Sequence, residues 1–192
     1  MRLFVAADPS TDVRRAAALR AAELRRTVDG ETFSRSIRWV PEQNLHLTVW
    51  FLGEVPEERS ASVLEALHPP LQVPSFELRL SGFGAFPLSG SPRVLWLGVA
   101  AGLAELSSAH AEVGARLAPW GFAAEGRPYS AHLTIARIKS PLRAGERAVL
   151  RSALSTVEAD PGTCRVDALT VYRSRTSAKG AVYQPLLRVP LS

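Results

Sequence analysis

The stretch His46-Leu47-Thr48-Val49 recurs, with one conservative change, as His132-Leu133-Thr134-Ile135, 86 residues further along the chain (132 minus 46). The chain contains only 4 histidines, so chance is a poor explanation for two His-x-Thr triplets with the same central residue. Apolar and β-branched residues fill the other positions of both stretches, as is typical of buried strands. The repeat therefore predicts two strands in corresponding places of two related halves.

The sequence on either side of the two stretches repeats as well. Each stretch is preceded by an apolar strand and an amphipathic helix, predicted at 2–7 with 13–28 and at 93–99 with 103–117. Each is followed by a proline and a helix that carries Glu-Arg and ends in Ala-Leu. We therefore expect an α/β (α+β) fold with two pseudo-symmetric lobes around a central cleft, forming one domain over residues 1–192.

Local signals predict the bounds of individual elements. The first helix is expected to start at Ser10 or Thr11 as N-cap, with one apolar face made by Val13, Ala17, Ala21, Leu24 and Val28. The motif strands are expected at Leu45–Leu52, closed by Gly53, and at His132–Ile138. Ser81–Pro92, rich in Gly, Ser and Pro, is predicted to be a loop between the halves, and the last two strands are predicted at Arg165–Tyr172 and Ala181–Val189.

Composition narrows the class of protein. The chain has 192 residues, with 46% hydrophobic and 21% charged residues, which is ordinary for a globular protein. No apolar stretch approaches the roughly 20 residues that span a bilayer, and the run Leu3–Ala7 is too short for a signal peptide. The single cysteine, Cys164, cannot form an internal disulfide, which favours the cytoplasm. We expect a protein with no membrane segment.

The basic residues are almost all arginine. The net charge is +5, and of 23 basic residues only Lys139 and Lys179 are lysine. The planar guanidinium suits bidentate contacts with phosphate and stacking on bases, although a skewed codon composition would produce the same bias. Charge alone is therefore compatible with a nucleic-acid partner, but it neither establishes one nor identifies a site.

The repeated motif places chemistry on one face of each strand. Residues i and i+2 of a strand share a face, so His46 projects with Thr48, and His132 with Thr134. Histidine changes charge near neutral pH, and a threonine hydroxyl can bind a phosphoryl oxygen. Two histidines on opposite sides of one phosphorus can serve an in-line displacement, one accepting a proton from water and one donating a proton to the leaving oxygen. Arg137, near the end of the second motif strand, can hold the phosphoryl charge.

The other histidines have structural interpretations. His68 precedes two prolines at a predicted helix end, where a cation complements the helix dipole. His110 lies along the apolar stripe of the helix at 103–117. The spacing of His, Cys and carboxylates does not suit zinc, and we expect neither a metal nor a cofactor.

The two motifs carry a resemblance to a known family. They stand in the contexts Asn44-Leu45-His46-Leu47-Thr48-Val49-Trp50-Phe51-Leu52-Gly53 and Tyr129-Ser130-Ala131-His132-Leu133-Thr134-Ile135-Ala136-Arg137. The chain resembles the RNA 2′,3′-cyclic phosphodiesterases, also called 2′-5′ RNA ligases, of the 2H phosphoesterase superfamily. The resemblance extends from Arg2-Leu3-Phe4 to Ala181-Val182-Tyr183. It implies a bilobal fold of antiparallel-rich sheet with outer helices around a cleft.

The resemblance also implies an activity and residue roles. The implied reaction is metal-independent opening of a 2′,3′-cyclic phosphate at an RNA end to a 2′-phosphomonoester. His46 would be the proton donor and His132 the proton acceptor, whereas the near-symmetric repeat by itself does not say which histidine is the acid. Thr48, Thr134 and Arg137 would bind the phosphate. Phe4 and Tyr129 are candidate base contacts, although a place in the core is the favoured interpretation of each. We expect a monomer.

Three alternatives remain open at this stage. Ligation would join a cyclic phosphate end to a 5′-hydroxyl, with a ribose hydroxyl in place of water. A phosphodiesterase for a small cyclic nucleotide or a 2′-5′ oligonucleotide would use the same histidines without long RNA. An RNA-binding module with silent histidines would bind RNA and turn nothing over.

Overall fold

The computed structural model describes residues 1–28, 30–122, 126, 128–177 and 180–192. Its strands are β1 (Arg2–Ala7), β2 (Ile37–Trp39), β3 (Leu47–Glu54), β4 (Phe76–Phe86), β5 (Val94–Ala101), β6 (Leu133–Ile138), β7 (Gly162–Val166), β8 (Ala168–Ser177) and β9 (Gly180–Pro190). Its helices are α1 (Thr11–Thr27), α2 (Glu31–Ser36), α3 (Glu57–Leu67), α4 (Leu103–Leu117) and α5 (Ala144–Thr156), with short 3-10 turns η1 (Glu42–Asn44) and η2 (Ala118–Trp120).

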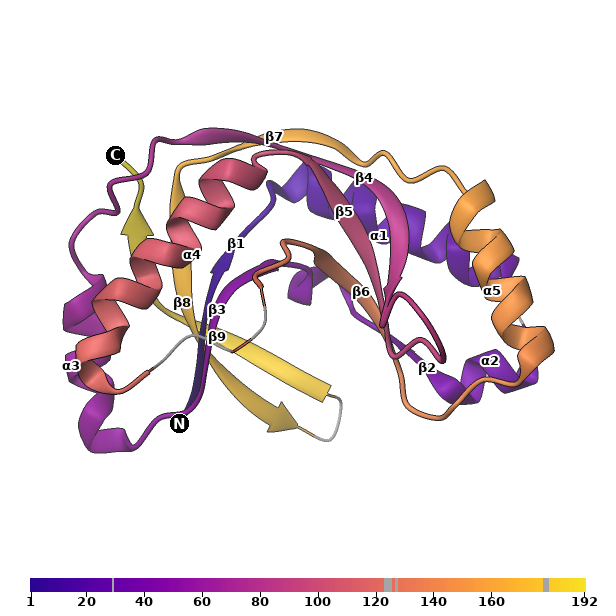
Figure 1. Ribbon diagram of the computed structural model, residues 1–192, viewed down its shortest axis with the longest axis horizontal. Helices are drawn as coiled ribbons and strands as arrows, with labels where there is room; N and C mark the ends of the chain where they lie inside the picture. Colours follow the sequence, from indigo (N-terminus) through magenta and orange to yellow (C-terminus); the bar gives the residue numbers. More distant parts are fainter. Residues whose placement is uncertain (29, 123–125, 127, 178–179) are drawn as a thin grey trace.

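All the named strands belong to one sheet. Their order is β7-β4-β5-β6-β3-β1-β8-β9, with β2 paired to β6, and each of these pairs is antiparallel. Figure 1 shows this sheet curled into an arch, with α1, α4 and α5 along its outer side and the β8–β9 hairpin projecting from the inner side. The predicted mixed α and β fold with an antiparallel-rich sheet is confirmed.

The order of strands and helices is symmetric about the two motif strands, and we call the line between these strands the pseudo-two-fold axis. β3 and β6 are neighbours at the centre of the sheet, where Leu47 pairs with Leu133. These are the second residues of the two motifs, and both side chains are fully buried. Outward from this pair, β1 lies beside β3 and is followed by α1, while β5 lies beside β6 and is followed by α4. The two halves of the repeat therefore meet at equivalent residues.

Both motif strands carry a β-bulge at the fourth motif residue. On β3 the register with β1 passes from Thr48 to Trp50 in one step and leaves Val49 as the extra residue. On β6 the register with β5 leaves Ile135 extra in the same way. An extra residue reverses the facing of the residues directly after it. Phe51 and Arg137, each five residues after its motif histidine, consequently return to the face of the motif threonines.

The first helix follows its predicted pattern. Ser10 caps α1 by accepting a hydrogen bond from the Val13 N–H (3.3 Å), which satisfies one free donor of the first turn. The helix buries the predicted apolar face against the sheet, namely Val13, Ala17, Ala21 and Leu24, followed by Val28.

Several predicted boundaries are wrong. The motif strands begin at Leu47 and Leu133 instead of Leu45 and His132, so each motif histidine stands directly before its strand. β3 does not end at Gly53 but continues to Glu54. Its register with β1 shifts a second time, leaving Leu52 extra, and Gly53, with a positive φ of 73°, pairs with Leu3. The predicted Ser81–Pro92 loop is shorter, since β4 runs on to Phe86. This is possible because the Trp96 ring covers Gly84, where a Cβ atom would come within 2.2 Å of it. The predicted strand Arg165–Tyr172 is two strands, β7 and β8, separated at Asp167.

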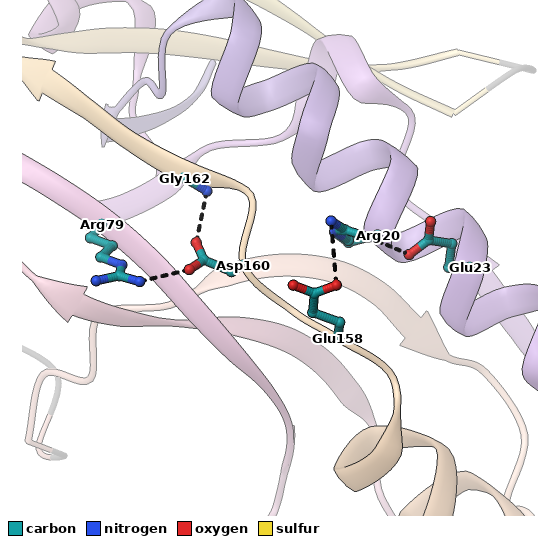
Figure 2. A network of polar contacts seen from close by, with 6 residues as sticks. All are labelled: Arg20, Glu23, Arg79, Glu158, Asp160 and Gly162. Carbon is teal, nitrogen blue, oxygen red and sulfur yellow. Dashed lines mark hydrogen bonds and ion pairs between the residues drawn. The ribbon is translucent and has the colours of Figure 1, made fainter.

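Exposed polar contacts tie α1 and β4 to the segment before β7 (Figure 2). Arg20 of α1 contacts Glu23 at 2.9 Å and Glu158 at 3.7 Å. Asp160 accepts hydrogen bonds from Arg79 (2.7 Å) and from the Gly162 N–H (2.9 Å), and the Arg79 contact lowers the pKa of Asp160. Such exposed pairs add little to stability. Within the described ranges, no helix has the length and apolar character to cross a membrane.

Candidate active site

The two motifs form one polar face at the centre of the sheet. Leu47 and Leu133 pair directly, so continuing the antiparallel register by one residue sets His46 beside Thr134 and Thr48 beside His132. Opposed residues of paired strands share a face. The motif leucines, with Val49 and Ile135, are buried on the other side of the sheet. The four polar residues therefore lie on one face of the sheet, opposite the buried motif leucines.

A cavity of about 430 Å³ opens on this face. It is lined by Arg2, Phe4, Val40, Asn44, His46, Thr48, Phe51, Thr134, Arg137, Ser174, Thr176, Ala181 and Tyr183. The structure thus brings five predicted residues together: Phe4, His46, Thr48, Thr134 and Arg137. His132 does not line the cavity itself but stands two residues before the lining Thr134.

The ring of His46 is held from several sides. Its Nδ1–H donates to the Asn44 carbonyl (2.8 Å), and its Nε2 lies 3.2 Å from the Thr48 hydroxyl. Because a carbonyl oxygen can only accept, this contact fixes the proton on Nδ1 and leaves Nε2 to exchange a proton. Phe4 stacks on the ring at a centroid distance of 4.8 Å, and Tyr183 packs edge-on at 5.2 Å.

His132 is held in the same way in the other half. Its Nδ1–H donates to the carbonyl of Ser130 (2.8 Å), the residue two positions upstream, as Asn44 is for His46. Phe86 packs edge-on against the His132 ring at 5.1 Å. The symmetry of the fold thus extends to ring orientation and tautomer, and both histidines present Nε2 for proton transfer.

Electrostatics distinguishes the two histidines. Burial lowers the pKa of both His46 and His132 below the ordinary value, and the nearby Arg137 cation acts in the same direction. Only His46 is also influenced by Asp8, whose negative charge raises the pKa of His46 and so favours its protonated form. Asp8 is anchored by hydrogen bonds from Thr170 (2.7 Å) and Tyr172 (3.0 Å).

Two further side chains stabilise the bulge on β3. The Val49 carbonyl, which the bulge removes from the strand ladder, accepts a hydrogen bond from His110 Nδ1 (2.7 Å). The Tyr129 ring stacks on His110 at 4.3 Å, and the Tyr129 hydroxyl donates to the Thr48 carbonyl (3.3 Å). The structural interpretation of His110 is confirmed. On β6 the Ile135 carbonyl is satisfied instead by the Val40 N–H (2.8 Å).

The two candidate base contacts, Tyr129 and Phe4, are both packed against other side chains of the protein. Tyr129 does not line the cavity, because its ring is stacked on His110 and its hydroxyl is bound to the motif strand. Phe4 does line the cavity, but it is only 4% exposed and packs beneath the His46 ring. Both residues support the motif strand of the first lobe.

Several cavity residues were missed by sequence reasoning. Ser174, Thr176 and Tyr183 come from β8 and β9, which the repeat does not include. The pairing of β8 with β1, which sets Ser174 beside Arg2, is a long-range feature. Phe51 was missed because strict alternation assigns it to the opposite face. Arg2 had a usable signal, since it shares a face of the first strand with Phe4.

The described residues contain no group of three or more His, Cys, Asp or Glu side chains placed to hold a metal ion. The lining contributes instead the imidazole of His46, several hydroxyls, among them those of Thr48 and Thr134, and the guanidinium groups of Arg2 and Arg137. The imidazole of His132 lies close enough to His46 to affect its pKa. Such a set can bind an anion and transfer protons on both sides of it.

Comparison with known proteins identifies a family that this chain matches. A family model described as the 2′-5′ RNA ligase superfamily matches residues 9–178. A Thermotoga maritima protein named RNA 2′,3′-cyclic phosphodiesterase is 32% identical over 187 residues, which cover 97% of this chain and 93% of the relative. A protein of the same name from Archaeoglobus fulgidus is 37% identical over 139 residues, covering 72% of this chain and 73% of the relative.

Solved structures share the whole fold. The crystal structure of TT0787 of Thermus thermophilus is similar with a TM-score of 0.72 and 32% identity, covering 100% of this chain and 98% of the other. That of E. coli LigT complexed with 3′-AMP is similar with a TM-score of 0.74 and 26% identity, with coverages of 100% and 98%.

Proposed function

This chain belongs to the 2′-5′ RNA ligase superfamily, and from that premise we propose that it hydrolyses 2′,3′-cyclic phosphate ends of RNA to 2′-phosphomonoesters. The observation that carries the proposal is the pairing of Leu47 with Leu133. It brings His46, Thr48 and Thr134 into one polar cavity. It also places His132, whose Nδ1–H is bound like that of His46, close enough to His46 to affect its pKa. A cyclic phosphodiester needs these groups, because its hydrolysis requires one proton acceptor, one proton donor and ligands for the phosphoryl oxygens.

In the proposed reaction His132 Nε2 accepts a proton from water while the water oxygen attacks phosphorus. The bond from phosphorus to O3′ breaks, and His46 Nε2–H donates its proton to O3′, leaving the phosphate on O2′. Thr48, Thr134 and Arg137 bind the non-bridging oxygens, where charge accumulates in the transition state. Exchange of protons with solvent returns both histidines to their starting states. The chain holds every group that these steps use.

The assignment of His46 as donor is supported by Asp8. A proton donor must be charged before the reaction, and Asp8 raises the pKa of His46 alone. His132 has no such partner among the influences on its pKa, which is lowered by burial and by Arg137. A neutral His132 is the form that accepts a proton from water.

The product identifies the activity. The protein would be incubated, in excess chelator, with an RNA oligonucleotide ending in a 2′,3′-cyclic phosphate, and the terminus of the product determined. We expect a 2′-phosphate. A 3′-phosphate would show that the bond from phosphorus to O2′ breaks instead of the bond to O3′. The absence of any product would contradict the proposal.

The same assay addresses the alternatives. Adding an oligonucleotide with a 5′-hydroxyl tests whether a ribose hydroxyl can replace water and yield a joined 2′-5′ product. Binding of RNA without any turnover would favour a silent RNA-binding module. Turnover of mononucleotide cyclic phosphates in preference to oligonucleotides would favour the small-nucleotide alternative.

Replacement of Arg137 by glutamine is expected to lower kcat/KM about 10- to 100-fold. The variant loses a charge-assisted hydrogen bond to the phosphate, typically about 1.5–3 kcal/mol, while keeping a polar side chain of similar length. Steady-state kinetics would measure the loss. Arg25→Gln is the matched control, since Arg25 is exposed on α1 and does not line the cavity. Equal kinetics for the two variants would exclude Arg137 as a phosphate ligand.

The lowered pKa values of the histidines predict the pH dependence. Activity needs His132 neutral and His46 charged, so the profile of kcat/KM should be bell-shaped. Because the pKa of each histidine lies below 6.5 in the free protein, the maximum is expected on the acid side of pH 6.5. Asp8→Asn removes the charge that raises the pKa of His46, so the alkaline limb should move to lower pH. Tyr172→Phe keeps that charge and should move the limb much less; equal shifts would contradict the role of Asp8.

The proposal extends to the oligomeric state of the protein and to its cellular compartment. We propose that the protein works as a monomer, since both motif histidines belong to one chain. Cys164 is a free thiol, consistent with work in the cytoplasm.

A further inference from the structure

Arg2 lies in the cavity, but the proposed reaction does not use it. It begins β1, is exposed, and places its guanidinium carbon 5.0 Å from the centroid of the Phe51 ring. Among the described residues no acidic side chain forms an ion pair with Arg2. Phe51 is itself 43% exposed, although it is a large apolar residue. A cation stacked on an exposed ring inside a polar cavity is available to bind an anion.

The position of Arg2 relative to His46 is set by β1. Arg2 and Phe4 project from the same face of this strand, and Phe4 packs beneath His46. Two residues along a strand span about 7 Å, so Arg2 lies about 7 Å along β1 from Phe4 and is therefore close to the catalytic centre. On its other side Arg2 pairs with Ser174, which in turn pairs with Tyr183. The cavity therefore continues from His46 past Arg2 toward the β8–β9 hairpin.

The cavity extends to one side of the pseudo-two-fold axis. The position five residues after the motif histidine holds Arg137 in the second lobe and Phe51 in the first. Among the described lining residues, β6 contributes Thr134 and Arg137, whereas β1, β3, β8 and β9 supply most of the others. A ligand whose phosphate sits between the histidines has room to continue along the first lobe, where Arg2 is the cation.

On the basis of the proposed function, we propose that Arg2, held over Phe51, binds the phosphodiester on the 5′ side of the terminal nucleotide. A 2′,3′-cyclic phosphate occupies both lower hydroxyls of the terminal ribose, so the RNA chain can continue only through O5′. Every RNA end of this kind carries that second phosphate, and a mononucleotide 2′,3′-cyclic phosphate lacks it. Arg2 would make the enzyme selective for polymer ends, with Phe51 as a positioning residue for the guanidinium.

The test compares a dinucleotide ending in a 2′,3′-cyclic phosphate with the corresponding mononucleotide. Arg2→Gln is expected to reduce the ratio of the two kcat/KM values about tenfold, the effect of one lost phosphate contact. The slope of log kcat/KM against log salt for the dinucleotide should become shallower by about 0.7. Phe51→Leu should reduce the ratio in the same direction by less, and Arg25→Gln should not change it.

The outcomes separate this inference from the function on which it rests. If Arg2→Gln lowers kcat/KM equally for both substrates, Arg2 does not bind the second phosphate and the inference is overturned. If the wild type cleaves neither substrate, the proposed hydrolysis is wrong, and the inference is decided by binding. The dinucleotide and mononucleotide 2′-phosphates would then be titrated into both proteins. A preference for the dinucleotide that Arg2→Gln abolishes supports the inference, and an unchanged preference overturns it.

Discussion

His132→Ala and His46→Ala are each expected to lower kcat by about 10²–10⁴-fold, the usual contribution of one positioned acid or base. Each histidine has its Nδ1–H bound to a backbone carbonyl, which leaves Nε2 for proton transfer. The other two histidines are engaged elsewhere, since His110 is bound to the Val49 carbonyl and His68 lies at the C-terminal end of α3. The losses would be measured at saturating substrate by product analysis. His68→Ala is the control and should retain wild-type kcat, while thermal unfolding verifies that all three variants fold. Wild-type turnover in either active-site variant would exclude the two-histidine mechanism.

A modified substrate distinguishes the two roles. If sulfur replaces O3′, the leaving group departs as a thiolate, which needs a proton far less than an alkoxide does because thiols have pKa values near 8.5. This substrate should restore much of the activity of His46→Ala and little of that of His132→Ala. The opposite pattern would show that His132 is the proton donor and His46 the acceptor.

Leu133→Ala is expected to lower the free energy of unfolding by about 2–5 kcal/mol. The Leu133 side chain is fully buried and is paired with Leu47 at the contact between the motif strands. Its loss removes apolar burial and leaves a cavity at the pseudo-two-fold axis. For a chain of this size each kcal/mol corresponds to about 2–4 °C in Tm, so calorimetry should resolve the effect easily.

A control and a kinetic measurement accompany this variant. Leu88→Ala removes the same atoms from a side chain that is 86% exposed, and should change the unfolding free energy by less than about 0.5 kcal/mol. At a temperature where Leu133→Ala is fully folded, its kcat should still be reduced, because the Leu47–Leu133 pair sets the histidines relative to each other. A wild-type kcat under those conditions would show that the pair matters only for stability.

Sequence periodicity was sufficient for the central features of the fold. The repeated motif carries its own strand pattern, so the facing of His46 with Thr48 and of the two leucines follows from alternation alone. The burial of Leu47 and Leu133 and the face of α1 agree with this reasoning. Their agreement reflects local rules, because period 2 and period 3.6 are properties of short segments.

The remaining parts of the site depend on long-range pairing. Strict alternation would turn Arg137 away from Thr134, three residues earlier, and it faces the cavity only because Ile135 is an extra residue relative to β5. A bulge is defined by the partner strand and leaves no reliable signal in one sequence. The role of Tyr129 depends similarly on contacts with Thr48 and His110 from other elements. Gly84 was counted toward the predicted Ser81–Pro92 loop, because its contact with the Trp96 ring depends on the pairing of β4 with β5.

The Leu47–Leu133 contact has the form of an isologous interface, in which the same residue of each half meets its counterpart across a two-fold axis. Two identical chains that joined in this way would be compelled to present identical groups on both sides of the phosphate. Linking the halves in one polypeptide removes that constraint, since a substitution in one half is not copied into the other. A guanidinium can then stand at residue 137 where the opposite half has an aromatic ring at residue 51. Covalent continuity is thus what allows a nearly symmetric frame to bind a substrate whose two ends differ.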